Sequence, residues 1–263
     1  MSDPLSSLPD FVNEFPSSEK TLLVVNRTGP EPLLNLLEGA FANQSVTVVE
    51  RESPAETDDL VCLIDDGEVV RTSPLDRLED TLLFVNADRY RTSTRPDGPG
   101  QFPDVLTGLN ELRFTVAGFP VSNKEKLLLV VISRFIEHLA LATGAGRLDS
   151  TFQYLSRLDD EYGTRTMYEW LGDSEVETHV YGVRDDPDVI TELDVRIHNG
   201  DTEPYRRSWV VAFSPSTLHS TDTTEPTHAA LVAIEIGPNV WQGVWTYDSS
   251  QVTRIQSYLQ QHF

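Results

Sequence analysis

The sequence predicts a mixed α/β protein with mostly parallel sheets flanked by helices, and an antiparallel hairpin near the C-terminus. Short aliphatic runs alternate with amphipathic helical patterns, which is typical of parallel α/β architectures. The last strand patterns follow one another closely, which favours the hairpin. The length of 263 residues accommodates one large core or two small ones. We expect two closely associated lobes.

The first predicted lobe comprises residues 21–145. Its predicted strands are aliphatic runs, at residues 21–26, 46–49, 61–64 and 68–72. Asp66 and Gly67 separate the last two runs, a pair that commonly forms a hairpin turn. Leucines at helical spacing predict a helix over 33–41, and Ser73-Pro74 opens a second, short helix that ends near Asp80. The apolar run 81–85 is compatible with a strand or with a continuation of that helix.

The clearest helix follows an unusually long polar loop, residues 89–102. Ser122 and Glu125 form a capping box ahead of an apolar pattern that ends before Gly144. Because apolar residues surround the first half of this helix, we expect it at the centre of the core.

The second predicted lobe comprises residues 146–263. Its predicted strands are again short apolar runs, at residues 152–155, 177–183, 193–197, 208–213, 229–236 and 240–246. Helices are predicted over 159–171 and 249–263. Residues 1–20 are acidic and rich in proline and serine. They are expected to be an N-terminal extension. They lack the basic flank and the apolar segment of a signal peptide, so no export is expected.

The charge balance favours a protein of a salt-adapted cell, and an ordinary acidic mesophile protein is the alternative. Acidic residues number 42 and basic residues 20, for a net charge of −22, and only Lys20, Lys124 and Lys126 are lysine. Excess carboxylate keeps a surface hydrated, whereas long lysine stems expose apolar surface that high salt makes adhesive. Direct nucleic-acid binding is not expected, because it requires a basic stripe.

Composition also limits localisation and metal chemistry. The longest apolar run has six residues, 127–132, far fewer than the roughly 20 needed to span a bilayer. We therefore expect a cytoplasmic protein with no membrane segment. Cys62 is the only cysteine, which excludes an internal disulfide and a thiolate metal cluster.

Motifs of catalysis are missing from the sequence. It contains no phosphate-binding P-loop, no nucleophile elbow and no H-E-x-x-H. The histidines are scattered singly, at His138, His179, His198, His219, His228 and His262. Single histidines are more often satisfied or exposed imidazoles than metal ligands. The sequence thus predicts no catalytic residue, no metal site and no identifiable cofactor, and we expect no enzyme activity.

Polar residues follow two of the predicted strands of the first lobe. Asn26 and Arg27 stand at the end of the first strand, where open α/β sheets bind ligands and helix N-termini receive anions. The same loop is equally compatible with simple helix capping. Asn86, Arg89 and Arg91 close the later run in a similar position. These five residues are candidate ligand-binding residues.

Cations gather at the start of the central helix. Asn123, Lys124 and Lys126 include two of the three lysines of the chain. Cations at a helix N-terminus oppose the helix dipole, so an acidic partner or a bound anion would explain them. Solvation of the helix end is the alternative.

Arginine and tryptophan concentrate in the last third of the chain. The candidates are Arg206, Trp209, Trp241 and Trp245. Trp241 and Trp245 are four residues apart in a predicted strand, so they share a face. Core packing, an aromatic ligand pocket and a partner surface are all compatible with them.

Several stretches together resemble the DICT sensory domain, a family named for its occurrence with diguanylate cyclases and two-component systems, in its stand-alone haloarchaeal form. The stretches are TLLVVNRTGPEP (21–32), LLFVNADRYRTSTR (82–95), SNKEKLLLVVISRFIE (122–137), TFQYLSRLDDEYGTRTMYEWL (151–171), HVYGV (179–183), EPYRRSWVVAF (203–213) and NVWQGVWTYD (239–248). The resemblance extends from about residue 20 to residue 263, and it supplies no catalytic residues.

This resemblance implies a sensory module of signal transduction that binds a small ligand or a signalling partner. Because no kinase, cyclase or helix-turn-helix segment lies outside the resemblance, such a module acts on another chain, a kinase or a transcription regulator. An enzyme or binding protein for a nucleotide or phosphorylated metabolite is one alternative, and a structural interaction adaptor is another. The ligand, the partner and the oligomeric state stay open.

Overall fold

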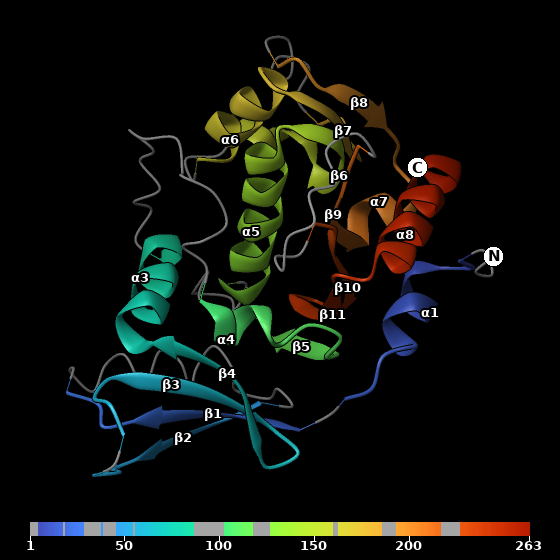
Figure 1. Cartoon of the computed structure of the whole chain (residues 1–263). Coiled ribbons are helices and arrows are strands. Elements are labelled where there is room, and N and C mark those ends of the chain that lie inside the picture. Colours follow the sequence, from blue (N-terminus) through green and yellow to red (C-terminus); the bar gives the residue numbers. More distant parts are fainter. Residues whose placement is uncertain are drawn as a thin grey trace.

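The computed structural model describes residues 5–17, 19–28, 38, 46–54, 56–86, 103–117, 127–159, 163–185, 193–216 and 227–263. Two mixed β-sheets flanked by helices form the fold (Figure 1), which confirms the predicted α/β class. The prediction of mostly parallel sheets is wrong. Among the described residues, six of the nine strand pairs are antiparallel.

The smaller sheet has the order β2-β1-β3-β4. Its strands are β1 (Lys20–Val25), β2 (Val46–Arg51), β3 (Leu60–Asp65) and β4 (Glu68–Pro74). Asp66 and Gly67 connect β3 to β4 with φ angles of 49° and 82°. Two successive positive φ angles match the twist of an antiparallel pair, and the predicted hairpin is confirmed.

The larger sheet has the order β5-β11-β10-β9-β6-β7-β8. Its strands are β5 (Phe114–Ala117), β6 (Ala145–Tyr154), β7 (Glu175–Val183), β8 (Arg196–Asn199), β9 (Ser208–Pro215), β10 (Ala229–Gly237) and β11 (Val240–Thr246). Pro238 and Asn239 join the antiparallel strands β10 and β11. Strands β6, β7 and β8 run parallel to one another.

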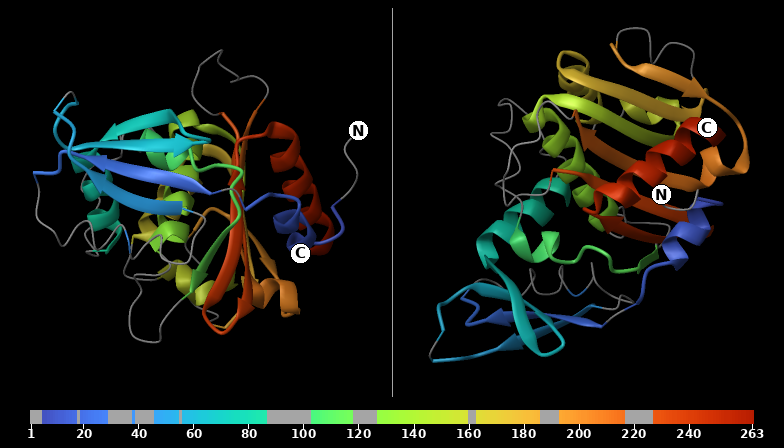
Figure 2. Two further views of the ribbon diagram at one scale, coloured as in Figure 1. Left: turned by 90° about the horizontal axis from the view of Figure 1, so that it is seen from below. Right: turned by 45° about the vertical axis from the view of Figure 1, so that its right-hand side comes forward.

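Helices lie on both faces of the larger sheet. The helices of the described residues are α1 (Leu8–Asn13), α3 (Leu75–Asn86), α4 (Asp104–Thr107), α5 (Leu127–Thr143), the 3-10 turn η3 (Leu155–Asp159), α6 (Thr164–Gly172), α7 (Glu203–Arg207) and α8 (Ser249–His262), of which α3 and α4 pack against β4 of the smaller sheet. In Figure 2, α5, α6 and the smaller sheet lie on one side of the larger sheet, whereas α1 and α8 lie on the other. The buried side chains accordingly form two clusters, one on each face.

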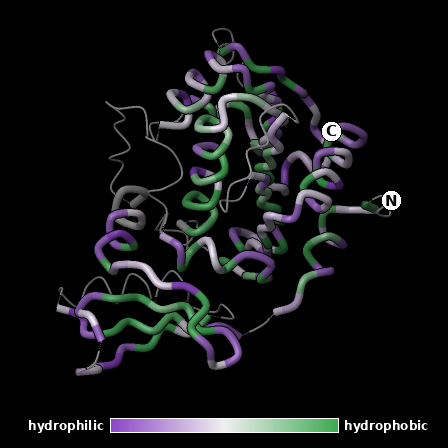
Figure 3. The backbone as a smooth tube through the Cα atoms, viewed as in Figure 1, coloured by the Kyte–Doolittle hydropathy of each residue, from purple (hydrophilic) through white to green (hydrophobic). Residues whose placement is uncertain are grey.

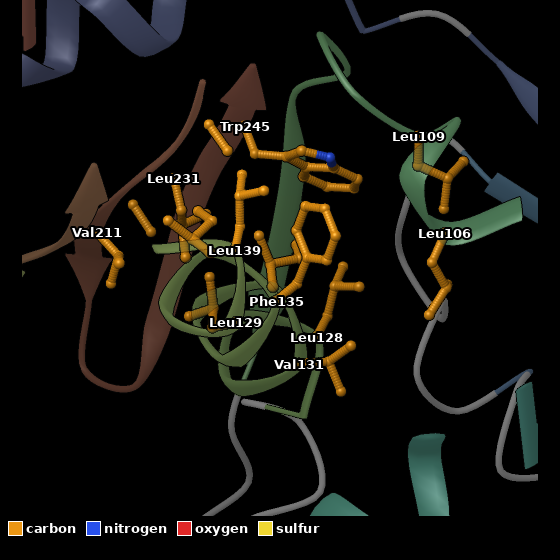
Figure 4. Packing of buried hydrophobic residues seen from close by; sticks show 14 of the residues in the cluster. Leu106, Leu109, Leu128, Leu129, Val131, Phe135, Leu139, Val211, Leu231 and Trp245 are labelled. Atoms are coloured by element: carbon orange, nitrogen blue, oxygen red, sulfur yellow. The ribbon is translucent and has the colours of Figure 1, made fainter. Parts of the chain in front are cut away.

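Helix α5 forms the centre of the larger cluster, as predicted. Most of its residues are hydrophobic (Figure 3), and its side chains Phe135 and Leu139 lie beside Trp245 and Leu231 (Figure 4). The helix is followed by Gly144 at φ 77°, a conformation that glycine adopts without strain and that commonly ends helices. Strand β6 begins at the next residue, earlier than predicted.

The N-terminal segment contributes to the core rather than extending from it. Leu8, Phe11 and Val12 of α1 are buried, and Glu14 accepts two hydrogen bonds of 2.9 Å from Arg254 on α8. The sheets also divide the chain differently from the predicted lobes, because β5 precedes α5 yet pairs with β11. Within the described parts of the chain, no helix combines the length and apolarity needed to cross a membrane.

Candidate functional site: a polar cluster on β6, β7 and β8

Asn26 and Arg27 are occupied by contacts within the protein. The Asn26 amide nitrogen donates to the main-chain oxygens of Ser53 and Glu56, at 2.8 and 3.1 Å, and its oxygen accepts from the Ser53 amide at 2.7 Å. Arg27 forms an ion pair with Glu50, with Nε and Oε1 2.9 Å apart. These contacts connect the end of β1 to the segment after β2, so they favour a structural role for the loop.

We expect Asn26→Ala to lower the free energy of unfolding by about 1–2 kcal/mol. Alanine loses the three hydrogen bonds, and it places a Cβ-bearing residue without a local polar partner at φ 49°. Asn26→Gly separates the two effects, because glycine tolerates this φ but also loses the bonds. Chemical denaturation measures the difference. A fully stable Asn26→Ala variant would contradict the structural role.

The tryptophans belong to the core. Trp241 and Trp245 are 1% and 3% exposed, and both lie in the cluster around α5, as their shared face predicted. Trp209 packs edge-on against Trp241 and donates its indole N–H to Ser133 Oγ at 2.9 Å. Their burial supports core packing over a ligand pocket. Arg206 is exposed, and its Nε donates to the main-chain oxygen of Asp201 at 3.1 Å.

The remaining sequence candidates do not define a site. Asn86 is the last residue of α3, so the prediction that it closes a strand is wrong. The apolar run before it continues the helix, because uninterrupted apolar residues fit either structure and tertiary packing decides between them. The other candidates lie outside the described residues: Arg89, Arg91, Asn123, Lys124 and Lys126.

A connected group of polar side chains lies on three neighbouring strands, on the sheet face shared with α8. Asp149 of β6 stands opposite His179 of β7, which stands opposite Arg196 of β8. Because alternate strand residues share a face, residues two positions away join the same group. We call it the β6–β8 polar cluster, comprising Arg147, Asp149, Glu177, His179, Tyr181, Arg196, His198 and, from α8, Gln256. Figure 2 shows these strands beside α8.

Asp149 is the buried anchor of the cluster, with no exposed surface. Arg147 binds both of its carboxylate oxygens, at 2.8 and 2.7 Å. The Tyr181 hydroxyl donates at 2.8 Å and the Gln256 amide at 3.0 Å. A bidentate guanidinium and two neutral donors offset the cost of burying the charge. Asp149 therefore connects the sheet to α8.

Two histidines form the centre of the cluster. Nδ1 of His179 and Nε2 of His198 are 2.8 Å apart, and the two rings are nearly parallel, at 13°, with centroids 5.1 Å apart. Nε2 of His179 lies 3.0 Å from Oε1 of Glu177. An ionised carboxylate only accepts, so this His179 nitrogen carries hydrogen. When both rings are neutral, His198 Nε2–H consequently donates to His179 Nδ1.

The environment of the cluster changes from exposed to buried along its length. Glu177 and Arg196 are exposed and form an ion pair, whereas His179 and Tyr181 are 5% and 1% exposed. Hydrogen bonding from His179, together with the Arg196 charge, lowers the pKa of Glu177. Burial and the Asp149 charge raise the pKa of Tyr181. Burial, followed by the effect of His179, lowers the pKa of His198.

The side chains of the cluster can exchange protons with solvent and can hydrogen bond to a polar ligand. The hydrogen-bond partners of His179 are the His198 ring and the Glu177 carboxylate. Across the same residues, no group of three or more His, Cys, Asp or Glu side chains is arranged to hold a metal ion.

His179 and His198 stand apart in the sequence but lie in contact in the fold, a contact that the sequence does not reveal. The alternation of Glu177-x-His179-x-Tyr181 was visible within the predicted strand 177–183, whereas Arg147 and Asp149 precede the predicted strand 152–155. The pairing of β7 with β8 was not visible in the sequence, because 12 residues separate those strands and strand register is a tertiary property.

Comparisons with known proteins place the chain in no family. No protein-family model matches it, and no curated protein matches its sequence. Among solved structures it is similar to the crystal structure of polyphosphate kinase from Porphyromonas gingivalis, with 8% identity and a TM-score of 0.34. The similarity covers 92% of this chain and 45% of that enzyme, so the chain spans less than half of its length. Similarity at this level does not define a shared fold.

Proposed function

We propose that this chain is a non-catalytic sensory or regulatory module of signal transduction, of the DICT type, that binds a small ligand or a signalling partner and acts on another chain. The observation that supports it is the β6–β8 polar cluster. Arg147 lies 4.0 Å from the exposed Glu177 carboxylate and 2.7 Å from the buried Asp149. Asp149 in turn accepts from Gln256 on α8. The cluster is thus continuous from the surface to a helix.

Such continuity is what a sensor requires. A ligand transmits a signal only if it binds one conformation better than another. A ligand that engages Glu177 or Arg196 changes the charge balance at Arg147, and Arg147 is shared with Asp149. The response is therefore expected in β7, β8 and α8, the elements that the cluster joins.

The alternative of an enzyme for a nucleotide or phosphorylated metabolite is less well supported. Such an enzyme needs cations directed at phosphate groups. Arg27, Arg147 and Arg196 instead each bind a carboxylate of the chain itself. A ligand at these residues has to displace an internal partner, which suits switching better than turnover.

Hydrogen–deuterium exchange tests the proposal. The full chain, in molar KCl, is compared with and without the small-molecule fraction of a halophilic cell extract, and native mass spectrometry identifies any added mass. We expect protection to change in β7, β8 and α8. Arg196→Ala removes an exposed charged donor, so it is expected to weaken the response by about tenfold or more.

Arg165→Ala is the matched control. Arg165 of α6 forms an ion pair with Asp159 on the opposite face of the sheet, so this variant is expected to respond like the wild type. Consumption of a phosphorylated metabolite by the wild-type chain would favour the enzyme instead. An absence of any protection change at the cluster would contradict the sensory proposal.

A further inference from the structure

Only one hydrogen atom fits between the facing nitrogens of His179 and His198. Their facing nitrogens are 2.8 Å apart, which is a hydrogen-bond distance, and two N–H groups cannot point at each other across it. The neutral pair has one hydrogen in this contact, on His198 Nε2. A first proton from solvent binds the outer nitrogen, Nδ1 of His198, and leaves the contact intact. A second proton requires hydrogen on both facing nitrogens.

We propose that the His179–His198 pair is a proton-sensing element, which accepts one proton with its contact intact and separates edge strand β8 from β7 when it accepts a second. The inference rests on the proposed function in one respect: it takes acidification to be a signal that the cluster senses. The proton-dependent separation follows from the geometry of the pair itself.

Charges of both signs face the pair from the surrounding elements. On β7, Glu177 accepts from His179, and Tyr181 stacks on His198 with centroids 4.4 Å apart. On β6, the carboxylate of Asp149 and the guanidinium of Arg147 nearly offset each other, and Arg196 adds positive charge from β8. From the side of α7 and α8, Tyr205 donates to the main-chain oxygen of Phe263, whose ring contacts Tyr181 edge-on.

These charges tolerate one imidazolium and oppose two. The Glu177 carboxylate stabilises a single positive charge shared by the rings. Two positive rings with centroids 5.1 Å apart repel each other enough to weaken binding of the second proton on the order of a hundredfold, at an effective dielectric constant of about 20. The two protonation steps therefore belong to the pair rather than to either residue.

The edge strand is the element that can relieve this repulsion. His179 is 5% exposed on β7, between β6 and β8 in the sheet, so its ring is fixed by packing. His198 is only half-buried, on a strand that pairs with β7 alone among the described strands. Moving β8 away separates the rings and hydrates His198. It also removes the stack on Tyr181, and so alters the contact with Phe263 at the end of α8.

The experiment combines histidine NMR with amide exchange on the full chain in molar KCl. Long-range proton–nitrogen spectra of 15N-histidine protein are recorded from pH 8 to pH 4. We expect two steps whose proton affinities differ by about a hundredfold. Over the second step, exchange of the Arg196–Asn199 amides, corrected for intrinsic pH dependence, is expected to rise at least about tenfold relative to β9.

Two phenylalanine variants control the result. His198→Phe keeps a ring against Tyr181 but cannot be protonated, and it is expected to abolish the pH-dependent exchange of β8. His262→Phe removes an exposed histidine from the end of α8 and is expected to behave like the wild type. Equal, independent affinities of His179 and His198, or β8 exchange that does not depend on pH in the wild type, would overturn the inference.

The outcome is independent of the ligand experiment. A proton response without any ligand- or partner-induced protection leaves this inference standing and removes support from the broader sensory proposal. Ligand-induced protection with no proton response supports the sensory proposal and overturns the proton-sensing inference.

Discussion

Replacing Glu137 with alanine is expected to lower the free energy of unfolding by about 3–5 kcal/mol. Arg134 and Glu137 form an ion pair on α5, with Nη1 and Oε2 2.7 Å apart and side chains only 9% and 4% exposed. Tyr168 also donates to Glu137, at 3.2 Å. Alanine removes the carboxylate and leaves a guanidinium in the core without its compensating charge. Guanidinium chloride unfolding, followed by circular dichroism, measures the loss.

The double variant Arg134→Met with Glu137→Leu distinguishes the ion pair from simple packing. It removes both charges at similar volume, so it is expected to be more stable than Glu137→Ala alone. The surface pair provides a second reference, because Arg165→Ala is expected to cost less than about 1 kcal/mol. If Glu137→Ala costs no more than the surface variant, the buried pair does not stabilise the core as argued.

Acidification is expected to destabilise the protein through His138. Burial, together with the nearby Arg134 charge, lowers the pKa of this histidine to about 4 from its usual 6.5. The folded state binds the proton more weakly than the unfolded state, so the contribution is fully present above pH 6.5 and is lost as the pH falls through 4. The linkage predicts a loss of about 2 kcal/mol between pH 7 and pH 5 from this residue.

The variant His138→Gln measures how much of the acid-induced loss of stability comes from His138. Glutamine is neutral throughout, so the decline in stability between pH 7 and pH 5 is expected to be shallower by about 2 kcal/mol. His262→Gln, on the exposed end of α8, is expected to leave the decline unchanged. Unfolding curves at fixed salt and a series of pH values provide the comparison. Parallel declines for wild type and His138→Gln would show that His138 does not titrate as described.

Much of the local structure was predictable because its signals are local. Asp66-Gly67 between two apolar runs predicted the β3–β4 hairpin, and the apolar pattern ending before Gly144 predicted α5. Turn chemistry and helical periodicity depend on residues within a few positions of one another. Helix α8 and strands β10 and β11 were located within a few residues for the same reason.

Strand direction and the candidate site were not predictable in this way. The apolar run of β9 predicts a strand, but nothing within it specifies antiparallel pairing with β6. Likewise, Asn26 and Arg27 follow a strand, as ligand-binding residues do, yet their partners Ser53 and Glu50 lie more than twenty positions away along the chain. Whether a polar side chain is free to bind depends on such distant partners.

The amino-acid sequence by itself determined the charge of the protein, the β3–β4 hairpin turn, helices α5 and α8, and which side chains of a predicted strand share a face. Glu177, His179 and Tyr181 share a face in any fold that keeps them in a strand. Only the tertiary structure decided that His198 lies against His179 and that Gln256 reaches Asp149. The alternation of side chains is a property of one strand, whereas register and neighbour order are set by the packing of the whole chain.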